Sequence, residues 1–159
     1  MPDDLGLTTM APRRSGNFEA RELGIEGLLL IEARRFGDTR GVFAETYNKR
    51  DFIALGIDEE FVQDNQSRSA AIGTVRGLHF QTAPHAQAKL VRVLNGSILD
   101  VAVDLRSGSA TFGRHVVSRL CAENSCMLYV PTGFAHGFIT LEPETEVAYK
   151  VTSYYAPDC

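Results

Sequence analysis

The sequence predicts an all-β protein, built as a sandwich or barrel of short strands. Short β-rich runs recur about every ten residues, and Gly, Asn, Ser or Pro turns separate them. The length of 159 residues fits one domain with a sizeable core. We found no internal repeat and no low-complexity block. We therefore predict a single domain over residues 18–159, preceded by a flexible N-terminal arm over residues 1–17.

The first part of this domain is predicted to hold two strands and a helix. The strand-like runs cover residues 27–36 and 41–48, and the turn-rich sequence GDTRG joins them. The helix is predicted within NKRDFIALGI, where Asn48 can cap the first turn and Gly56 can end the last. One or two short helices are expected in all.

The rest of the domain is predicted to be strands. Asn95-Gly96 has the composition of a two-residue hairpin turn, which predicts that the strands on either side of it pair. The β-rich segments are residues 59–69, 73–81, 88–96, 97–106, 113–124, 126–141 and 145–155.

The run SILDVAVDLR alternates between two chemically different faces. Leu99, Val101 and Val103 lie on one face, which we expect to pack against a second sheet. Asp100 and Asp104 lie on the other. Carboxylates are costly in a sealed apolar core, so this face is expected to meet a polar barrel lumen or solvent. Small jelly-roll barrels hold a ligand in such a mouth.

Composition excludes several classes of function. A net charge of −4 provides no general attraction for nucleic acid or an anionic membrane. The longest aliphatic run, LLLI, is far shorter than the roughly 20 residues of a membrane span. The cysteines are Cys121, Cys126 and Cys159, an odd set that predicts free thiols and a reducing cytoplasm.

Metal and nucleophilic chemistry are poorly supported by the motifs. PTGFAHGF resembles the second half of the metal site in cupin-type jelly rolls, but the first half reads His79-Phe80-Gln81 instead of His-x-His. Glutamine is a poor ligand beside imidazole, so we predict no metal and no cofactor. Sequences for a G-x-S-x-G nucleophile, a P-loop and a dinucleotide fingerprint are missing. General acid–base chemistry by His79 remains, with a structural histidine as the alternative.

Six motifs occur together and in order: DTRGVFAE, FVQDNQSRS, VRGLHFQ, KLVRVLNGSILDVAVDLR, PTGFAHGF and AYKVTSYYAP. Over roughly residues 25–157 the chain resembles the dTDP-4-dehydrorhamnose 3,5-epimerase family. The resemblance implies a cupin-like jelly-roll barrel, also called a double-stranded β-helix. It also implies a cofactor-free homodimer that epimerises a thymidine-diphosphate-linked 4-keto-6-deoxy sugar on the route to L-rhamnose.

The resemblance also implies roles for particular residues. His79 matches the catalytic base, Tyr149 the proton donor on the opposite face of the sugar, and Lys89 the cation beside it. The implied substrate-binding residues are Arg40 and Arg76 for the diphosphate, Glu45, Gln63 and Asn65 for the nucleotide end, Lys89 and His136 for the sugar, and Phe36 and Tyr155 around the thymine ring. Core packing of the two aromatics and a solvated turn role for Arg40 are the alternatives.

The match departs from the family at the end of the chain. The resemblance implies a further segment whose aspartate orients the base histidine, and this segment has no counterpart in the sequence. Asp100 or Asp104 is a candidate substitute. The alternative functions are a C3-only epimerase, a ketoisomerase, a non-catalytic sugar-nucleotide-binding cupin and a metal-dependent cupin oxygenase. The lysine and the tyrosine motif argue against the ketoisomerase.

Overall fold

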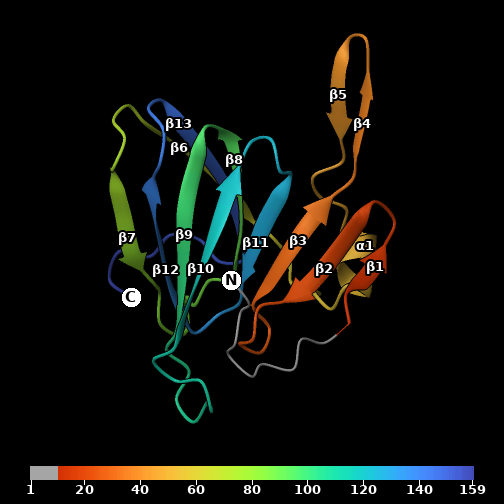
Figure 1. Cartoon of the computed structure of the whole chain (residues 1–159). Coiled ribbons are helices and arrows are strands. Elements are labelled where there is room, and N and C mark those ends of the chain that lie inside the picture. The colour runs from red at the N-terminus through yellow and green to blue at the C-terminus, as the bar shows by residue number, and fades with distance from the viewer. Residues whose placement is uncertain (1–10) are drawn as a thin grey trace, which may run out of the picture.

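The computed structural model describes residues 11–159, in which two antiparallel sheets face each other as a barrel (Figure 1). The larger sheet has the strand order β1-β2-β3-β11-β8-β13-β6, and the smaller has the order β10-β9-β12-β7. The predicted all-β class is therefore confirmed. The strands are β1 (Arg13–Ser15), β2 (Phe18–Glu22), β3 (Leu29–Ala33), β4 (Arg35–Asp38), β5 (Gly41–Ala44), β6 (Gln63–Ser69), β7 (Val75–His79), β8 (Lys89–Asn95), β9 (Ser97–Asp104), β10 (His115–Cys121), β11 (Cys126–Val130), β12 (Phe134–Thr140) and β13 (Thr145–Val151), and the helix is α1 (Lys49–Ala54).

One hydrophobic core fills the space between the two sheets. Side chains alternate across each strand, so every second residue points inward. Full burial of an aliphatic or aromatic side chain contributes about 1.5–3 kcal/mol, and this core holds the barrel walls together. Its buried members are Ile25, Leu28, Val91, Val93, Ile98, Ala102, Leu120, Leu128, Val130, Phe134, Phe138 and Val147.

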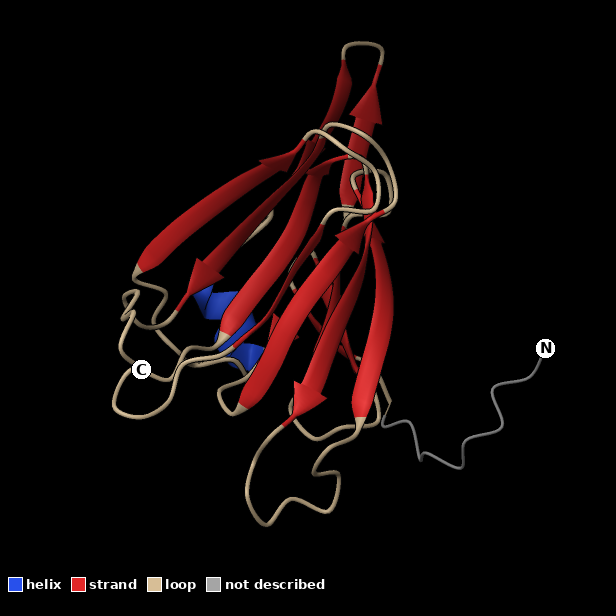
Figure 2. Cartoon of the chain, turned by 90° about the vertical axis from the view of Figure 1, so that its left-hand side faces the viewer, coloured by secondary structure: helices blue, strands red, loops and turns tan. Residues whose placement is uncertain are grey.

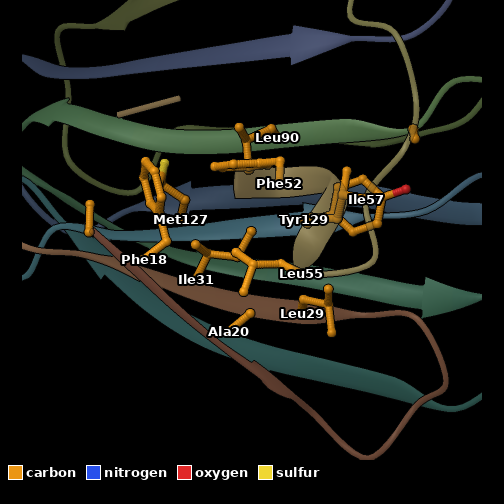
Figure 3. Close-up of a cluster of buried hydrophobic side chains, with 12 residues drawn as sticks. Phe18, Ala20, Leu29, Ile31, Phe52, Leu55, Ile57, Leu90, Met127 and Tyr129 are labelled. Carbon is orange, nitrogen blue, oxygen red and sulfur yellow. The ribbon is translucent and has the colours of Figure 1, made fainter. Parts of the chain in front are cut away.

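A second core lies between the larger sheet and α1, against the sheet face that points away from the barrel (Figures 2 and 3). Phe52 of α1 meets Phe18 and Tyr47 edge-to-face, with ring centroids 5.1 and 5.0 Å apart. The predicted cap is confirmed, because the Asn48 side chain accepts a hydrogen bond from the Asp51 backbone N–H at 3.3 Å. Among the described residues, no helix is both long and apolar enough to span a membrane.

The hairpin predicted at Asn95-Gly96 is wrong. The two strands follow each other in sequence but lie in different sheets, with β8 paired to β11 and β13 and β9 paired to β10 and β12. Gly96 has a φ of +77°, and a Cβ at this position would lie 2.5 Å from the Thr145 hydroxyl oxygen. Gly96 therefore lies at a tight corner where the chain passes from one sheet to the other. The Asn-Gly dipeptide at this corner has the same composition as a hairpin turn.

The aliphatic face of β9 was expected to be the buried one, and the structure buries the other face instead. Asp100 and Asp104 lie on the inward face and are fully buried, whereas Leu99, Val101 and Val103 are only half-buried on the outward face. The inward face is mixed, because Ile98 and Ala102 on it belong to the inter-sheet core, and the aliphatic face does not pack against the second sheet. Both carboxylates have partners, His136 for Asp100 and Arg106 in the following loop for Asp104, which offsets the cost of burying them.

The N-terminal segment contains strands that the sequence did not predict. Of the arm predicted over residues 1–17, residues 1–10 lie outside the described range, and residues 13–15 form β1 instead of a loose arm. β1 pairs with β2, and the Ser15 hydroxyl donates to the Asp51 carboxylate at 3.0 Å. These contacts tie the segment to the sheet and to α1.

The strand predicted over residues 27–36 is split in two. β3 belongs to the larger sheet, whereas β4 leaves it after Arg34 and, within residues 11–159, pairs only with β5. The resulting hairpin projects from the barrel (Figure 1). Its apolar side chains are exposed, with Val42 at 56% and Phe43 at 68% of full exposure.

Candidate active site

The mouth of the barrel is hollow beside β6 and β7, the end strands of the two sheets. Two hollows of about 530 and 430 Å³ share His79, Lys89 and Tyr149 among their lining residues, so the three predicted catalytic residues border one common space. The fold therefore brings together these three with five predicted binding residues, namely Gln63, Asn65 and Tyr155 in the larger hollow and Arg76 and His136 in the smaller.

An irregularity in the β7–β12 pairing places Arg76 and His79 in the same hollow. Residues three apart on a regular strand point to opposite faces of a sheet. Here His79 pairs with His136 but Arg76 pairs with Phe138, and the register shifts between these pairs. Both Arg76 and His79 consequently line the smaller hollow.

Two glycines allow β7 and β12 to approach closely beneath this hollow. A Cβ on Gly77 would lie 2.6 Å from the Cα of Gly137, and a Cβ on Gly137 would lie 2.7 Å from the Arg76 carbonyl oxygen. Neither space admits a side chain. The pair of glycines therefore sets the distance between the strands that carry His79 and His136.

His136 is held by a buried carboxylate. Its Nε2 lies 2.5 Å from Asp100 Oδ1, and both side chains are almost completely buried. The bond leaves Nδ1 as the ring nitrogen available to a ligand. Asp100 Oδ2 is buried and has no hydrogen-bond partner among the described residues.

Neither candidate substitute for the base-orienting aspartate bonds to His79. Asp100 bonds to His136, and Asp104 bonds to Arg106, Ser109 and Thr111. The Arg106 guanidinium is the main reason that the pKa of Asp104 lies far below its usual range. Asp104 therefore fastens the loop after β9 and takes no part in the hollow.

Lys89 begins β8 as a half-buried residue, so its side chain is partly withdrawn from water. This burial lowers the pKa of Lys89, and the negative charge of Asp100 opposes part of that decrease. The side chain lines both hollows. A desolvated cation interacts strongly with negative charge, so Lys89 is placed to stabilise an oxyanion in the mouth.

Tyr149 and the polar side of β6 line the mouth from the larger sheet, which also carries Lys89, whereas His79 and His136 lie on the smaller sheet. Tyr149 pairs with Asn65 across β13 and β6 and packs at the border of the inter-sheet core. Along β6 the residues Gln63, Asn65 and Ser67 are half-buried, and the residues between them are exposed. Ser67 also lines the smaller hollow. The sequence did not single out Ser67, because every residue of QDNQSRS is polar and no hydrophobic alternation marks its inward face.

The guanidinium of Arg76 is held against β6. Its Nε donates to the Ser69 hydroxyl oxygen at 3.0 Å, and Nη2 donates to the Arg68 carbonyl oxygen at 3.2 Å. Ser69 is buried. These bonds orient the remaining N–H groups of a planar donor that suits phosphate oxygens. The sequence did not predict a role for Ser69, because its hydrogen bond to Arg76 joins β6 to β7 and forms only in the folded protein.

The predicted binding residues on the hairpin are not brought to this mouth. Arg40 pairs with Asp38 in the β4–β5 turn and lines a separate shallow hollow with Phe36. Glu45 accepts hydrogen bonds from Asn17 and Asn48. Phe36 and Tyr155 are 40% and 72% exposed, so core packing is wrong for both aromatics. Arg40 is exposed to solvent in a turn, which agrees with the alternative that it is a solvated turn residue.

Gln81 stands in place of the second histidine of the metal motif, and its side chain bonds to backbone groups of the chain. Within residues 11–159, no group of three or more His, Cys, Asp or Glu side chains is placed to hold a metal ion. The described cysteines are all free thiols.

The fold and the hollow define a jelly-roll barrel of the cupin type with histidine, lysine and tyrosine side chains in its mouth. Comparison with known proteins identifies the family. The sequence model for dTDP-4-dehydrorhamnose 3,5-epimerase matches residues 22–159, and the chain belongs to this family. The enzyme of that name from Pseudomonas aeruginosa is 52% identical over 141 residues, which cover 88% of this chain and 77% of the relative. The Sinorhizobium fredii enzyme is 51% identical over 138 residues, which cover 87% and 71%.

Solved structures agree with this assignment. The family member from Bacillus anthracis, crystallised with TDP and PPi, superposes with a TM-score of 0.87 at 51% identity, covering 89% of this chain and 81% of that one. The Legionella pneumophila enzyme in complex with dTDP-4-keto-L-rhamnose superposes with a TM-score of 0.84 at 46% identity, covering 89% and 74%.

Proposed function

We propose that this protein is a cofactor-free isomerase that inverts C3 and C5 of dTDP-4-dehydro-6-deoxy-D-glucose, giving dTDP-4-dehydro-L-rhamnose for deoxysugar synthesis. The observation that carries the proposal is the meeting of His79, Lys89 and Tyr149 around one hollow in a chain of this family. Base, cation and phenol are the groups that proton transfer beside a ketone requires.

The chemistry follows from the ketone at C4, which acidifies the hydrogens on C3 and C5. In the proposed mechanism His79 removes a proton and an enolate forms. Lys89 stabilises the negative oxygen, and Tyr149 returns a proton to the opposite face, which inverts the carbon. A positioned proton-transfer group supplies ~10²–10⁴-fold in rate. His136, oriented by Asp100, is proposed to bind the sugar beside them.

Binding of the nucleotide is proposed to use the rest of the mouth and the hairpin. Arg76 is oriented to receive a phosphate, and Gln63, Asn65 and Tyr155 line the larger hollow. Phe36, Arg40 and Glu45 are the other proposed nucleotide contacts. They lie on or beside a hairpin that projects from the barrel, so we infer that they act on the mouth of a second copy in a homodimer (Figure 1). The free thiols support the cytoplasm as the proposed location.

Proton exchange in deuterium oxide tests the function. The protein is incubated with dTDP-4-keto-6-deoxyglucose, and the sugar protons are followed by NMR. Loss of both the C3 and the C5 signals is expected, and treatment with a chelator should leave the rate unchanged. Loss of the C3 signal alone would identify a C3-only epimerase, and binding without exchange would identify a non-catalytic cupin.

Replacement of the proposed base provides the matching mutant. His79→Asn should slow exchange by at least ~10²-fold, because the variant loses the group that is proposed to take the proton. Circular dichroism and the affinity for dTDP serve as controls for folding and for an intact nucleotide site. Exchange at the wild-type rate in a folded His79→Asn variant would contradict the mechanism.

A further inference from the structure

Gln81 stands where a metal-binding barrel carries its second imidazole, and its side chain is fully engaged with backbone groups. Nε2 donates to the carbonyl oxygens of His85 and Tyr154, at 2.6 and 3.2 Å. Oε1 accepts from the Ala156 backbone N–H at 3.0 Å. One amide therefore joins the loop after β7 to the segment after β13.

Only a primary amide satisfies these three partners. Two carbonyl oxygens require two donors from one nitrogen, and the N–H requires an acceptor on the same side chain. Neutral imidazole has one donor and one acceptor, a carboxylate accepts only, and lysine and arginine donate only. Asparagine has the right chemistry but is one methylene shorter. The departure from His-x-His thus has a structural reason.

The segment that Gln81 holds is a strap, defined here as residues 152–157. Two further glutamines hold it: Gln87 Nε2 donates to the Ser153 carbonyl oxygen at 2.7 Å, and Gln63 Oε1 accepts from the Tyr155 N–H at 3.4 Å. Thr152 bonds to Ala88 through its hydroxyl and its backbone N–H. Strap residues Tyr155, Ala156 and Pro157 line the larger hollow together with His79.

Hydrogen bonds, more than packing, fix the position of the strap. Tyr154 is 67% exposed and Tyr155 is 72% exposed, so neither ring is held by a core. Two of the three Gln81 bonds reach the residues on either side of Tyr155. Loss of these bonds would release the backbone that carries the Tyr155 ring.

We propose that Gln81 is a positioning residue for nucleotide binding, which acts by holding the strap so that Tyr155 forms a wall of the hollow. The inference rests on the proposed function, in which Tyr155 lines the nucleotide-binding hollow, and it takes the Tyr155 ring to stack on the thymine. Because Gln81 lies two residues beyond His79, the same loop links the strap to the strand of the base. Gln81 itself need not touch the substrate.

A double-mutant cycle on dTDP binding tests the proposal. Calorimetry would compare the wild type, Gln81→Ala, Tyr155→Ala and the double variant. Loss of a base–aromatic stack is expected to weaken binding about tenfold. If Gln81 acts through Tyr155, Gln81→Ala should weaken dTDP binding similarly, and the double variant should bind no more weakly than Tyr155→Ala. In Gln81→Ala, the rate of proton exchange at saturating substrate should change by less than about threefold.

Backbone amide exchange provides a readout that is independent of activity. The Ala156 amide should exchange faster in Gln81→Ala. It should also exchange faster in Gln81→Glu, because a carboxylate has no donor for the two carbonyl oxygens and is repelled by them. Gln66→Ala is the matched control: its amide donates to Glu146 at 3.1 Å on the exposed side of β6, and both dTDP affinity and Ala156 exchange should stay unchanged.

The results separate the two proposals. Wild-type affinity in Gln81→Ala, or additive losses in the double variant, would overturn the role of Gln81. Failure of the wild type to bind dTDP would overturn the proposed function, whereas faster Ala156 exchange in Gln81→Ala would still support the hold of Gln81 on the strap.

Discussion

At the scale of single residues, Lys89 combines burial with charge at the start of a strand. Burial lowers its pKa, which means that the charged form is less stable in the folded protein than in water. Such a residue weakens the fold, so its presence in the mouth is best explained by function.

Replacement of this lysine should separate activity from stability. Lys89→Met keeps the length and apolar stem of the side chain but removes the charge. We expect the exchange rate to fall by ~10²-fold or more, because the enolate loses its cation, and the melting temperature to rise. Calorimetry and the NMR assay measure the two effects. A loss of both stability and activity would mean that Lys89 supports the fold.

The pH dependence of the free energy of unfolding should reveal the lowered pKa of Lys89. The unfolded state keeps the lysine proton up to about pH 10.5, whereas the folded state releases it at a lower pH. Between the two pKa values the unfolded state binds more protons, so the contribution of Lys89 to the free energy of unfolding rises with pH.

The stability advantage expected for Lys89→Met should therefore shrink as the pH rises through this window. Urea unfolding of both proteins at several pH values between 7 and 10.5 measures the difference. A constant difference over the range would contradict a lowered pKa for this lysine.

At the scale of elements, the contact between β7 and β12 sets the geometry of the mouth. Gly137→Ala would place a Cβ 2.7 Å from the Arg76 carbonyl oxygen, so β7 must move away from β12. We expect a loss of about 1–3 kcal/mol in stability and a large fall in exchange rate, because Arg76 and His79 both lie on β7. Chemical unfolding and the NMR assay measure these effects.

A glycine without crowding provides the control. Gly37→Ala in the hairpin would place a Cβ no closer than 3.8 Å to other heavy atoms, so its unfolding free energy should stay near that of the wild type. Equal stability of Gly137→Ala and the wild type would show that the two strands separate without cost.

At the scale of the whole molecule, the exposed hairpin predicts a site shared between two copies. His79→Asn and Arg40→Ala chains should each be weakly active as homodimers. In a mixed dimer, one mouth combines an intact His79 with an intact hairpin from the other chain. Co-refolded mixtures should regain about a quarter of wild-type activity by random pairing of two-fold dimers. Mixed dimers that remain inactive, or a monomer in sedimentation experiments, would contradict the shared site.

Much of the fold was predictable because strand signals are local. The spacing of β-rich runs and the Asn48 cap indicated the all-β class and the helix, and both are confirmed. The hairpin at Asn95-Gly96 failed because the same dipeptide suits a hairpin turn and a corner between sheets. Strand pairing depends on partners far along the chain, and a turn motif does not contain that information.

The sequence by itself determined the chemistry that is present: an ordered set of motifs with His79, Lys89 and Tyr149, and an amide in place of an imidazole at Gln81. Only the tertiary structure decided which groups meet. It turned Asp100 toward His136, placed Arg76 and His79 in one hollow through an irregular register, and bound Gln81 to the strap. The physical reason is that residue types and their order are set along the chain, whereas distances between side chains arise only when distant strands pack together.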